Sequence, residues 1–541
     1  MSGLSRSAVR RSIGGLLLVA ALAIGFALRA VAPSEVSDLR PRPDAFEYEE
    51  AARNLVEGEG YVLVVDGAKY PTRYPPGMSL LIAPVLRFAD QGFGTGVLAV
   101  LACSLLTIVG TFVLATLAAG PIAGGVAALL LAVSPEDVTW SQKVMSDVPS
   151  TCAVTWILVA SFLVARRGRP AAWLAVGVAI GLAALIRLTN GAVAVPAALL
   201  ALLSAWPGHG PSGALRALLG LGAGVAVGLV PLLAYQLSSF GSLLGTGYDL
   251  WAPEPFFALG YLTGPPAAGG TEPNALVYAQ NLVGLGRLYT WPIALLVLLG
   301  IASGARAGGR RRELALLAAS TLAAFFLGHV AYYWQDARFL LPTLPVLFAA
   351  AGSAFAAQES GWVRGAALAA VILGLVPLAR PGETYVPDKR FGEPQVLARI
   401  ATEAPPDAAI LVRTNEASFR RILRKEPRQD RIWVQLGVDV HEAAIQRHGI
   451  RPYEAGTRPD WIRRDLRPKS AVAVVSQLLA EGRPVYLSTL LAFQVAPFEQ
   501  ILAALNAAFR LEPVVVIGGR TELFRVLPRD GVPRVDAKDG A

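Results

Sequence analysis

Acidic and hydroxyl side chains gather in short segments between long apolar runs. The first segment carries Asp44, Glu47 and Tyr48, and the spacing of Asp44 and Tyr48 places both on one face of a helix. The second segment ends at Asp147, directly before the next apolar run. A positioned carboxylate can remove a proton from a hydroxyl group, and two carboxylates can hold a divalent cation. Asp44 and Asp147 are therefore candidate catalytic residues and candidate metal ligands.

Each acid also has an ordinary structural interpretation. Asp44 can cap a helix over residues 45–56, because Asp is a preferred N-cap residue. Asp147 can cap the following apolar helix, since a proline comes two residues later at an early helical position. Glu49 and Glu50 fit a solvated helix face whose first turn favours negative charge. The residue types alone leave the structural and the catalytic interpretations of the two aspartates open.

Basic and aromatic residues accompany these acids. Arg73 and Tyr74 stand before a Pro-Pro-Gly turn, where they could also anchor the chain at the membrane interface. Arg187 and Arg338 each border an apolar run, and the planar donor fork of arginine suits a phosphate group. For Arg338, a local ion pair with Asp336 is an alternative. The candidate substrate-binding residues are Glu47, Tyr48, Arg73, Tyr74, Gln142, Lys143, Arg187 and Arg338.

The composition excludes two broad classes of protein. Of the 541 residues, 54% are hydrophobic and 16% are charged, and the mean hydropathy is +0.50. One water-soluble core cannot hide so much apolar surface, which excludes an ordinary soluble enzyme, and the low charge excludes a disordered chain. The net charge of +9 is first a topology signal in such a protein. The two cysteines, Cys103 and Cys152, lie in apolar runs and form no recognisable metal or disulfide motif.

Eleven apolar runs predict membrane-spanning helices. The first run follows several arginines and could be a signal peptide. However, Pro33 after its A-x-A pattern disfavours cleavage, so we expect a retained span. A further apolar segment, 78–88, is too short to cross a membrane. The eleven runs cover residues 13–29, 94–118, 121–133, 148–165, 171–186, 192–206, 218–237, 275–301, 314–333, 339–356 and 362–378.

Basic loops determine the expected sidedness of these spans. Arginines cluster at 166–169 and at 306–312, and loops of this kind stay in the cytoplasm. Both loops are cytoplasmic if the N-terminus is cytoplasmic and residues 78–88 form a re-entrant or interfacial helix. The prediction is a multi-pass protein of the inner (plasma) membrane whose C-terminal part is extracytoplasmic. The other loops expected outside cover residues 31–76, 134–147, 187–191, 238–274 and 334–338.

The C-terminal part of the chain has a different composition. Residues 1–380 are predicted to form the transmembrane domain, and residues 381–541 a small α/β domain that packs over the outer loops. The predicted fold class is therefore mostly α, polytopic, with a C-terminal extracytoplasmic α/β domain. His441 and His448 are interpreted as surface or core histidines rather than metal ligands. The expected strands cover 408–414, 431–435, 484–488, 514–517 and 522–527, and the expected helices 396–404, 471–480 and 498–509.

In this order and on one side of the membrane, the motifs form a familiar pattern. An acid stands four residues before a tyrosine, Asp44 and Tyr48, in a large loop after the first span. The loop returns through Arg73-Tyr74-Pro75-Pro76-Gly77, and a second acid, Asp147, precedes the fourth span. Over roughly residues 13–378 the chain resembles the GT-C polytopic glycosyltransferases. The resemblance is to the bacterial branch related to protein O-mannosyltransferases and the lipid A aminoarabinose transferase.

The resemblance implies an activity and a set of partners. It implies that a sugar moves from a polyprenyl-phosphate carrier to a hydroxyl on a lipid, glycan or protein acceptor at the outer leaflet. Asp44 matches the position of the catalytic acid and would act as the base of an inverting transfer. The resemblance also implies a possible divalent cation, Mg or Mn, at Asp44 and Asp147. This sequence departs from the common pattern at Ala45, where many relatives carry a second acid, although Glu47 could substitute.

Two other classes of function compete with a transferase. A transporter or flippase for a lipid-linked or anionic substrate usually shows repeated halves and polar residues at mid-membrane. The sequence has no repeat, and its polar clusters lie at one edge of the membrane. A scaffold or sensor that acts through the C-terminal part would need a recognisable site there, and none is found. Nucleic-acid binding is not expected, because the basic residues divide between topology loops and the extracytoplasmic part.

Overall fold

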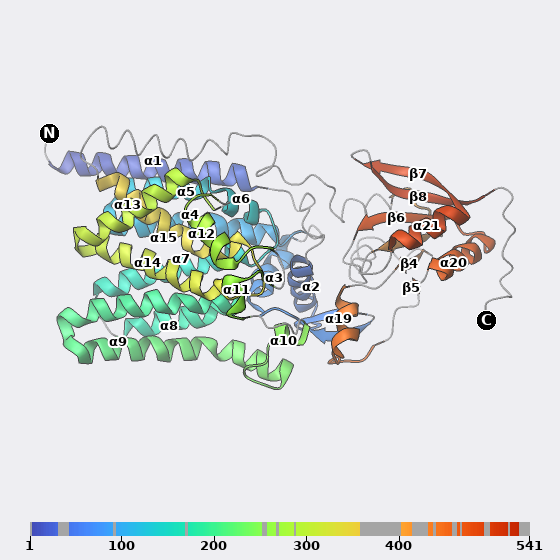
Figure 1. Ribbon diagram of the computed structural model, residues 1–541, viewed down its shortest axis with the longest axis horizontal. Coiled ribbons are helices and arrows are strands. Elements are labelled where there is room, and N and C mark those ends of the chain that lie inside the picture. Colours follow the sequence, from blue (N-terminus) through green and yellow to red (C-terminus); the bar gives the residue numbers. More distant parts are fainter. Residues whose placement is uncertain are drawn as a thin grey trace.

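The computed structural model describes most of the chain. The predicted span at 362–378 and residues 396–401 of the predicted helix at 396–404 lie outside the described residues. The described ranges are 3–30, 43–65, 67–89, 94–167, 171–251, 257–266, 270–285, 288–357, 402–413, 431–436, 440–456, 462–465, 468–491, 498–517 and 520–529. Figure 1 shows a bundle of long helices and, beyond one end of it, a separate small sheet.

Long apolar helices form the bundle, and the protein is a multi-pass membrane protein. Within the described ranges, seven helices are long and apolar enough to cross a membrane, or eight if one bent pair counts as a span. Two shorter apolar helices, α8 and α13, complete the bundle. The helices are α1 (Gly3–Arg29), α4 (Val97–Ala119), α5 (Pro121–Ala132), α6 (Pro135–Ser141), α7 (Asp147–Arg167), α8 (Ala172–Ala183), α9 (Ala194–Phe240), α13 (Trp291–Ala307), α14 (Gly309–Val330) and α15 (Leu344–Ala357).

The predicted spans differ most from the observed helices at residues 275–301. The run at 275–301 is not one helix but two, α12 (Asn274–Leu282) and α13, because Gly284 adopts a positive φ of 81° between them. The runs at 192–206 and 218–237 are two spans, as predicted, Leu188–Trp206 and Gly210–Phe240. They share the label α9, which is broken where Gly210 leaves the helical conformation. Apolar runs predict that helices exist, whereas single glycines decide where they end or join.

The predicted outer loops fold into short elements at the end of the bundle nearest the sheet (Figure 1). Gly77, which opens α3, donates its amide hydrogen to the Leu185 carbonyl at 2.7 Å and so ties the first loop to the end of α8. The elements are α2 (Pro43–Val56), β1 (Val62–Val65), β2 (Ala68–Pro71), α3 (Gly77–Ala89), η3 (Leu188–Val193), α10 (Gly247–Trp251), α11 (Gly260–Thr263) and η4 (Ala337–Thr343).

The C-terminal sheet has six strands in the order β5-β4-β3-β6-β8-β7. The first four pair in parallel, and β8 and β7 add antiparallel pairs. All five predicted strands are present, and β5, with two arginines and an aspartate in four residues, was not predicted. The elements are β3 (Ala409–Arg413), β4 (Ile432–Leu436), α19 (Val440–His448), β5 (Ile462–Asp465), α20 (Pro468–Ala480), β6 (Val485–Leu491), α21 (Phe498–Ala508), β7 (Phe509–Ile517) and β8 (Arg520–Pro528).

Candidate active site

Helix α2 is enclosed by the surrounding protein. It packs on α3, and both Glu49 and Glu50 are buried. Glu49 Oε2 accepts a hydrogen bond from the Gly94 amide at 3.0 Å. The prediction of a solvated face at Glu49 and Glu50 is therefore wrong. Their spacing suggested an exposed face, but segments distant in the sequence cover it.

Asp44 lies in the first turn of α2 and is half-buried. The helix begins at Pro43, two residues before the predicted start, so Asp44 is within the helix rather than ahead of it. Burial, and after it the charge of Asp44, raise the pKa of the Tyr74 hydroxyl well above its usual range. Tyr74 is therefore neutral at physiological pH. The Asp44 carboxylate, at the other end of the same loop, lies close enough to raise the pKa of the Tyr74 hydroxyl.

Five residues from the first two predicted outer loops contact one another beside Asp44. Arg73 forms an ion pair with Glu47, with Nη2 and Oε1 3.1 Å apart. The rings of Tyr74 and Tyr48 lie with centroids 4.7 Å apart, and Tyr48 Oη donates a hydrogen bond to Ser146 Oγ at 3.1 Å. Burial alone would lower the pKa of Arg73, but the Glu47 carboxylate raises it above the ordinary value, so the guanidinium stays charged. These contacts join the first outer loop to the second.

Asp147 and two arginines form the second part of the site. Asp147 is only 1% exposed and accepts a short, charge-assisted hydrogen bond from Arg187 Nη1. Arg338 Nη1 is 3.8 Å from the other carboxylate oxygen of Asp147, and Arg338 Nε is 3.5 Å from Asp336. The alternative of a local Asp336–Arg338 ion pair is therefore present, and its atoms are closer than those of the Arg338–Asp147 pair. Among the described residues, Nε and Nη1 of Arg338 are buried and have no hydrogen-bond partner.

Trp140 provides an aromatic surface for two of the predicted cations. The Arg338 guanidinium lies 4.5 Å from the centre of the Trp140 ring, and the Lys143 ammonium lies 4.7 Å from it. Gln142, the other residue predicted here, donates its amide hydrogen to the Leu28 carbonyl at 2.7 Å. The Gln142 side chain therefore contacts the end of α1.

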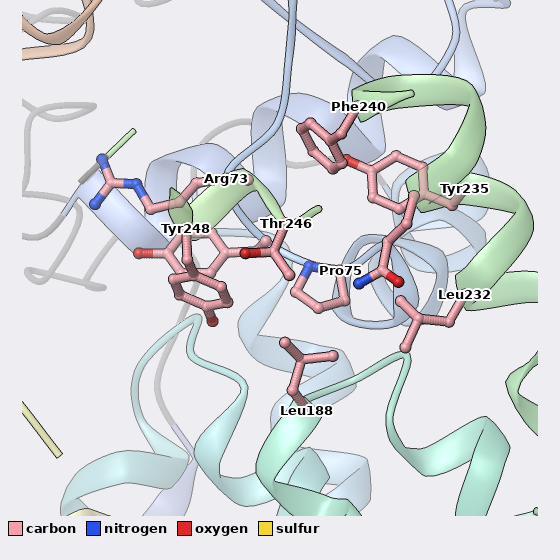
Figure 2. A pocket seen from close by; sticks show the side chains of 11 residues that line it. Arg73, Pro75, Leu188, Leu232, Tyr235, Phe240, Thr246 and Tyr248 are labelled. Atoms are coloured by element: carbon pink, nitrogen blue, oxygen red, sulfur yellow. The ribbon is translucent and has the colours of Figure 1, made fainter. Parts of the chain in front are cut away.

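A pocket lies next to these groups, between the first outer loop and α10 (Figure 2). Arg73 and Tyr248 lie on one side of it, and Tyr235 and Phe240 from α9 lie opposite. The pocket offers about 210 Å³ of space, part of it open to solvent. Neither Asp44 nor Asp147 lines it, so it adjoins the acidic centre rather than contains it.

Sequence reasoning missed two aromatic contributors to the site. Tyr248 of α10 packs edge-on against Tyr74 with centroids 5.5 Å apart, and Trp140 supports Arg338. Both residues stand in outer loops that were already singled out, and an aromatic residue in such a loop is a usable signal. Their partners, however, come from distant parts of the chain, so the sequence could not assign the contacts.

The acids do not form a good site for a divalent cation. Asp147 already binds Arg187 and has Arg338 close by, and two guanidinium groups disfavour a metal ion at the same carboxylate. In the part of the chain that the structure describes, no group of three His, Cys, Asp or Glu residues could hold a metal ion. The donor set at Asp44 and Asp147 therefore does not fit Mg or Mn.

Comparisons with known proteins agree with this architecture. Residues 73–235 match the model of the family described as dolichyl-phosphate-mannose-protein mannosyltransferase. The structure is similar to ArnT from Cupriavidus metallidurans bound to undecaprenyl phosphate, with a TM-score of 0.59 and 18% identity over 94% of this chain and 97% of that one. It is also similar to the apo state of the same enzyme, with a TM-score of 0.57 and 17% identity over the same shares. No curated protein sequence matches the chain.

The predicted class is confirmed. The fold is the GT-C fold of ArnT, and the family match includes Arg73, Tyr74, Asp147 and Arg187. The protein is a polytopic membrane protein with this fold, and its residues 73–235 match a family of mannosyltransferases.

Proposed function

We propose that the protein moves a sugar from a polyprenyl-phosphate carrier to a hydroxyl acceptor at the outer face of the membrane, with inversion at the sugar carbon. ArnT, which has the same fold, is described as bound to undecaprenyl phosphate. The observation that carries the proposal is Arg338. Its buried Nε and Nη1 have no hydrogen-bond partner among the described residues, and a phosphate oxygen would satisfy them.

In this proposal Asp44 is the general base. The residue is half-buried, so an acceptor hydroxyl can reach its carboxylate. Asp44 removes the hydroxyl proton while the acceptor oxygen bonds to the anomeric carbon of the sugar. The bond from that carbon to the phosphate oxygen breaks, and the phosphate leaves with the electron pair. Attack opposite the leaving group inverts the configuration. No step requires a metal ion.

The surrounding residues would stabilise the leaving phosphate. Arg338, with Arg187 and Arg73 nearby, would meet the negative charge that develops on the phosphate oxygens. Asp147 would orient Arg187 and Arg338 rather than react, because its carboxylate already pairs with them. Tyr74, whose pKa is raised by burial, stays protonated and can donate a hydrogen bond to the donor or the acceptor. The acceptor is a lipid, a glycan or a protein hydroxyl.

The first test is turnover of radiolabelled polyprenyl-phosphate sugars by the purified protein in detergent. Asp44→Asn removes the base and should lower kcat by about 10²–10⁴-fold. Glu57→Gln, which changes an exposed carboxylate just beyond α2, is the matched control and should keep full activity. Equal turnover by Asp44→Asn would remove Asp44 from its assigned role. Movement of the lipid-linked sugar across sealed vesicles without a new glycosidic bond would favour the transporter alternative instead.

We further propose the orientation expected from the basic loops, in the inner membrane. The N-terminus is cytoplasmic, and the C-terminal part, 381–541, lies outside as a separate domain. Single-cysteine variants Ser242→Cys and Ala307→Cys, both at exposed sites, test this sidedness. In intact spheroplasts an impermeant maleimide should label the first variant, and it should label the second only after permeabilisation. The reverse result would invert the topology and place Asp44 on the cytoplasmic side.

A further inference from the structure

The break between α5 and α6 lies close to the end of α1 (Figure 1). The two helices meet at an angle of 61°. Beyond the break, α6 carries Trp140, whose ring supports the Arg338 guanidinium at 4.5 Å. The indole is itself held, since its Nε1 donates a hydrogen bond to Glu136 Oε1 at 2.7 Å. The angle of this break therefore determines where the support for Arg338 lies.

Arg29, at the end of α1, bridges the break. Its side chain is fully buried, and it donates hydrogen bonds to the carbonyls of Leu131, at 2.9 Å, and of Ala132, which end α5. The same guanidinium binds Asp137 Oδ2 in α6 at 2.7 Å. We call Arg29, Asp137 and these two carbonyls the α5–α6 clamp. One planar group thus joins the end of one helix to the start of the next.

Two further contacts fix the clamp to its surroundings. Arg29 Nε donates to Ser104 Oγ of α4 at 2.8 Å, and Ser104 Oγ donates to Asp137 at 3.2 Å. At the other end of α6, Gln142 donates to the carbonyl of Leu28, which directly precedes Arg29. Both ends of α6 are therefore tied to the last residues of α1.

Stability alone is a poor explanation for a buried ion pair at this place. Removing two charges from water costs free energy that offsets much of the attraction between them. Well-packed apolar residues in the same place often give equal stability. A pair of apolar side chains cannot, however, hold two carbonyls and a carboxylate in fixed directions. An arginine fork can, because its donors lie in one plane at fixed angles. The chemistry of the clamp therefore favours a role in geometry.

We infer that Arg29 is a positioning residue for the donor phosphate. The clamp sets the angle of α6, α6 places Trp140, and Trp140 holds Arg338 where the phosphate binds. The inference rests on the proposed function in that it takes Arg338 to bind the phosphate. Neither Arg29 nor Asp137 contacts the substrate in this scheme.

The test compares stability with donor affinity. The double variant Arg29→Met/Asp137→Leu removes both charges and should melt close to the wild-type protein, since no unpaired charge remains buried. Without the clamp, the cation–π contact at Trp140 weakens, and KM for the donor should rise about five- to tenfold. The kcat at saturating donor should change much less. A double variant with wild-type stability and wild-type KM would overturn the inference.

Arg29→Lys is a second variant, which keeps the positive charge but lacks the planar set of guanidinium donors. It should fold, bind Asp137 and fail to hold both carbonyls, so KM for the donor should rise while the melting temperature changes little. Arg306→Lys, an exposed substitution of the same kind, is the matched control. Unchanged KM in a folded Arg29→Lys protein would also contradict the clamp.

A binding measurement separates this inference from the proposed function. Polyprenyl phosphate without a sugar can be titrated into the purified proteins in detergent. Weaker binding by Arg29→Lys than by the wild type would support the clamp even if no sugar transfer were detected. Equal binding by both proteins would contradict the clamp and leave the transferase proposal intact. No binding and no transfer by the wild type would contradict both.

Discussion

The three arginines of the site have different amounts of free hydrogen-bonding capacity. Arg73 is paired with Glu47 at 3.1 Å, and Arg187 is bound directly to Asp147. Arg338 remains beyond hydrogen-bond length from both of its acids, at 3.8 and 3.5 Å. An incoming anion would therefore find its best available donors on Arg338, without first breaking a hydrogen bond.

Arg338→Lys should weaken donor binding. Lysine keeps the charge but has no planar fork, and it cannot stack on Trp140 as a guanidinium does. KM for the lipid-phosphate sugar should rise about tenfold, measured by initial rates over a range of donor concentrations. Arg216→Lys, at an exposed arginine of α9, is the control and should leave KM unchanged. An unaltered KM in Arg338→Lys would exclude this side chain from the phosphate site.

At the scale of helices and strands, the sequence predicted which elements form better than where each element begins and ends. Apolar runs identified the long helices, because their length and composition are local properties. The burial of Glu49 in α2 was not predictable, since it depends on Gly94 from another segment. The break at Gly284 was missed because one glycine changes little in an apolar average, although its φ of 81° ends the helix.

For the site, the sequence likewise predicted which residues take part but not which of them contact one another. The order of Asp44, Tyr48, Arg73 and Asp147 along the chain and their places in segments between apolar runs could be predicted from the sequence. The pairing of Asp147 with Arg187 and Arg338 could not, because the three residues come from separate loops. Arg29 was passed over as the end of a span, although a charge beside apolar residues signals a buried partner. Such partners are found only when helices are placed side by side.

Gly77→Val should destabilise the entry of the first outer loop into α3. A Cβ at Gly77 would lie 2.5 Å from the backbone of Leu185, so the loop would have to move away from the end of α8. The expected cost is about 1–3 kcal/mol, seen as a lower melting temperature in detergent. Gly15→Val in α1 is the control, because no atom lies within 4 Å of its added Cβ. Equal melting temperatures for the two variants would show that this contact is not tight.

At the scale of the whole molecule, residues 440–456 connect the C-terminal part to the first outer loop. The Lys69 amide donates to the Glu454 carbonyl at 3.0 Å, and the Tyr453 amide donates to the Lys69 carbonyl at 2.7 Å. These residues add one antiparallel bridge to the edge of β2, and Ile450 packs with Leu63 and Trp251. The segment, which we call the strap, thus lies against the loop that carries Arg73.

Gly456→Val should detach the strap. A Cβ at Gly456 would lie 2.0 Å from the Gly67 carbonyl oxygen, which no side chain can occupy. Once strand pairing is lost, Lys69 becomes accessible, and trypsin should cleave after it faster than in the wild type. Mass spectrometry of the fragments measures this rate. Gly260→Val, with open space around its added Cβ, is the control. Unchanged cleavage at Lys69 in Gly456→Val would contradict the pairing.

The strap also has a consequence for biosynthesis. Lys69 leaves the ribosome long before its partner Glu454, which follows about 385 residues later. At about 5–20 residues per second, the hairpin waits on the order of 20–80 s for the segment that pairs with its edge. During that interval its edge is unpaired, and an unpaired strand edge invites association with other chains. The nascent protein is therefore exposed to association through this edge until Glu454 has been synthesised.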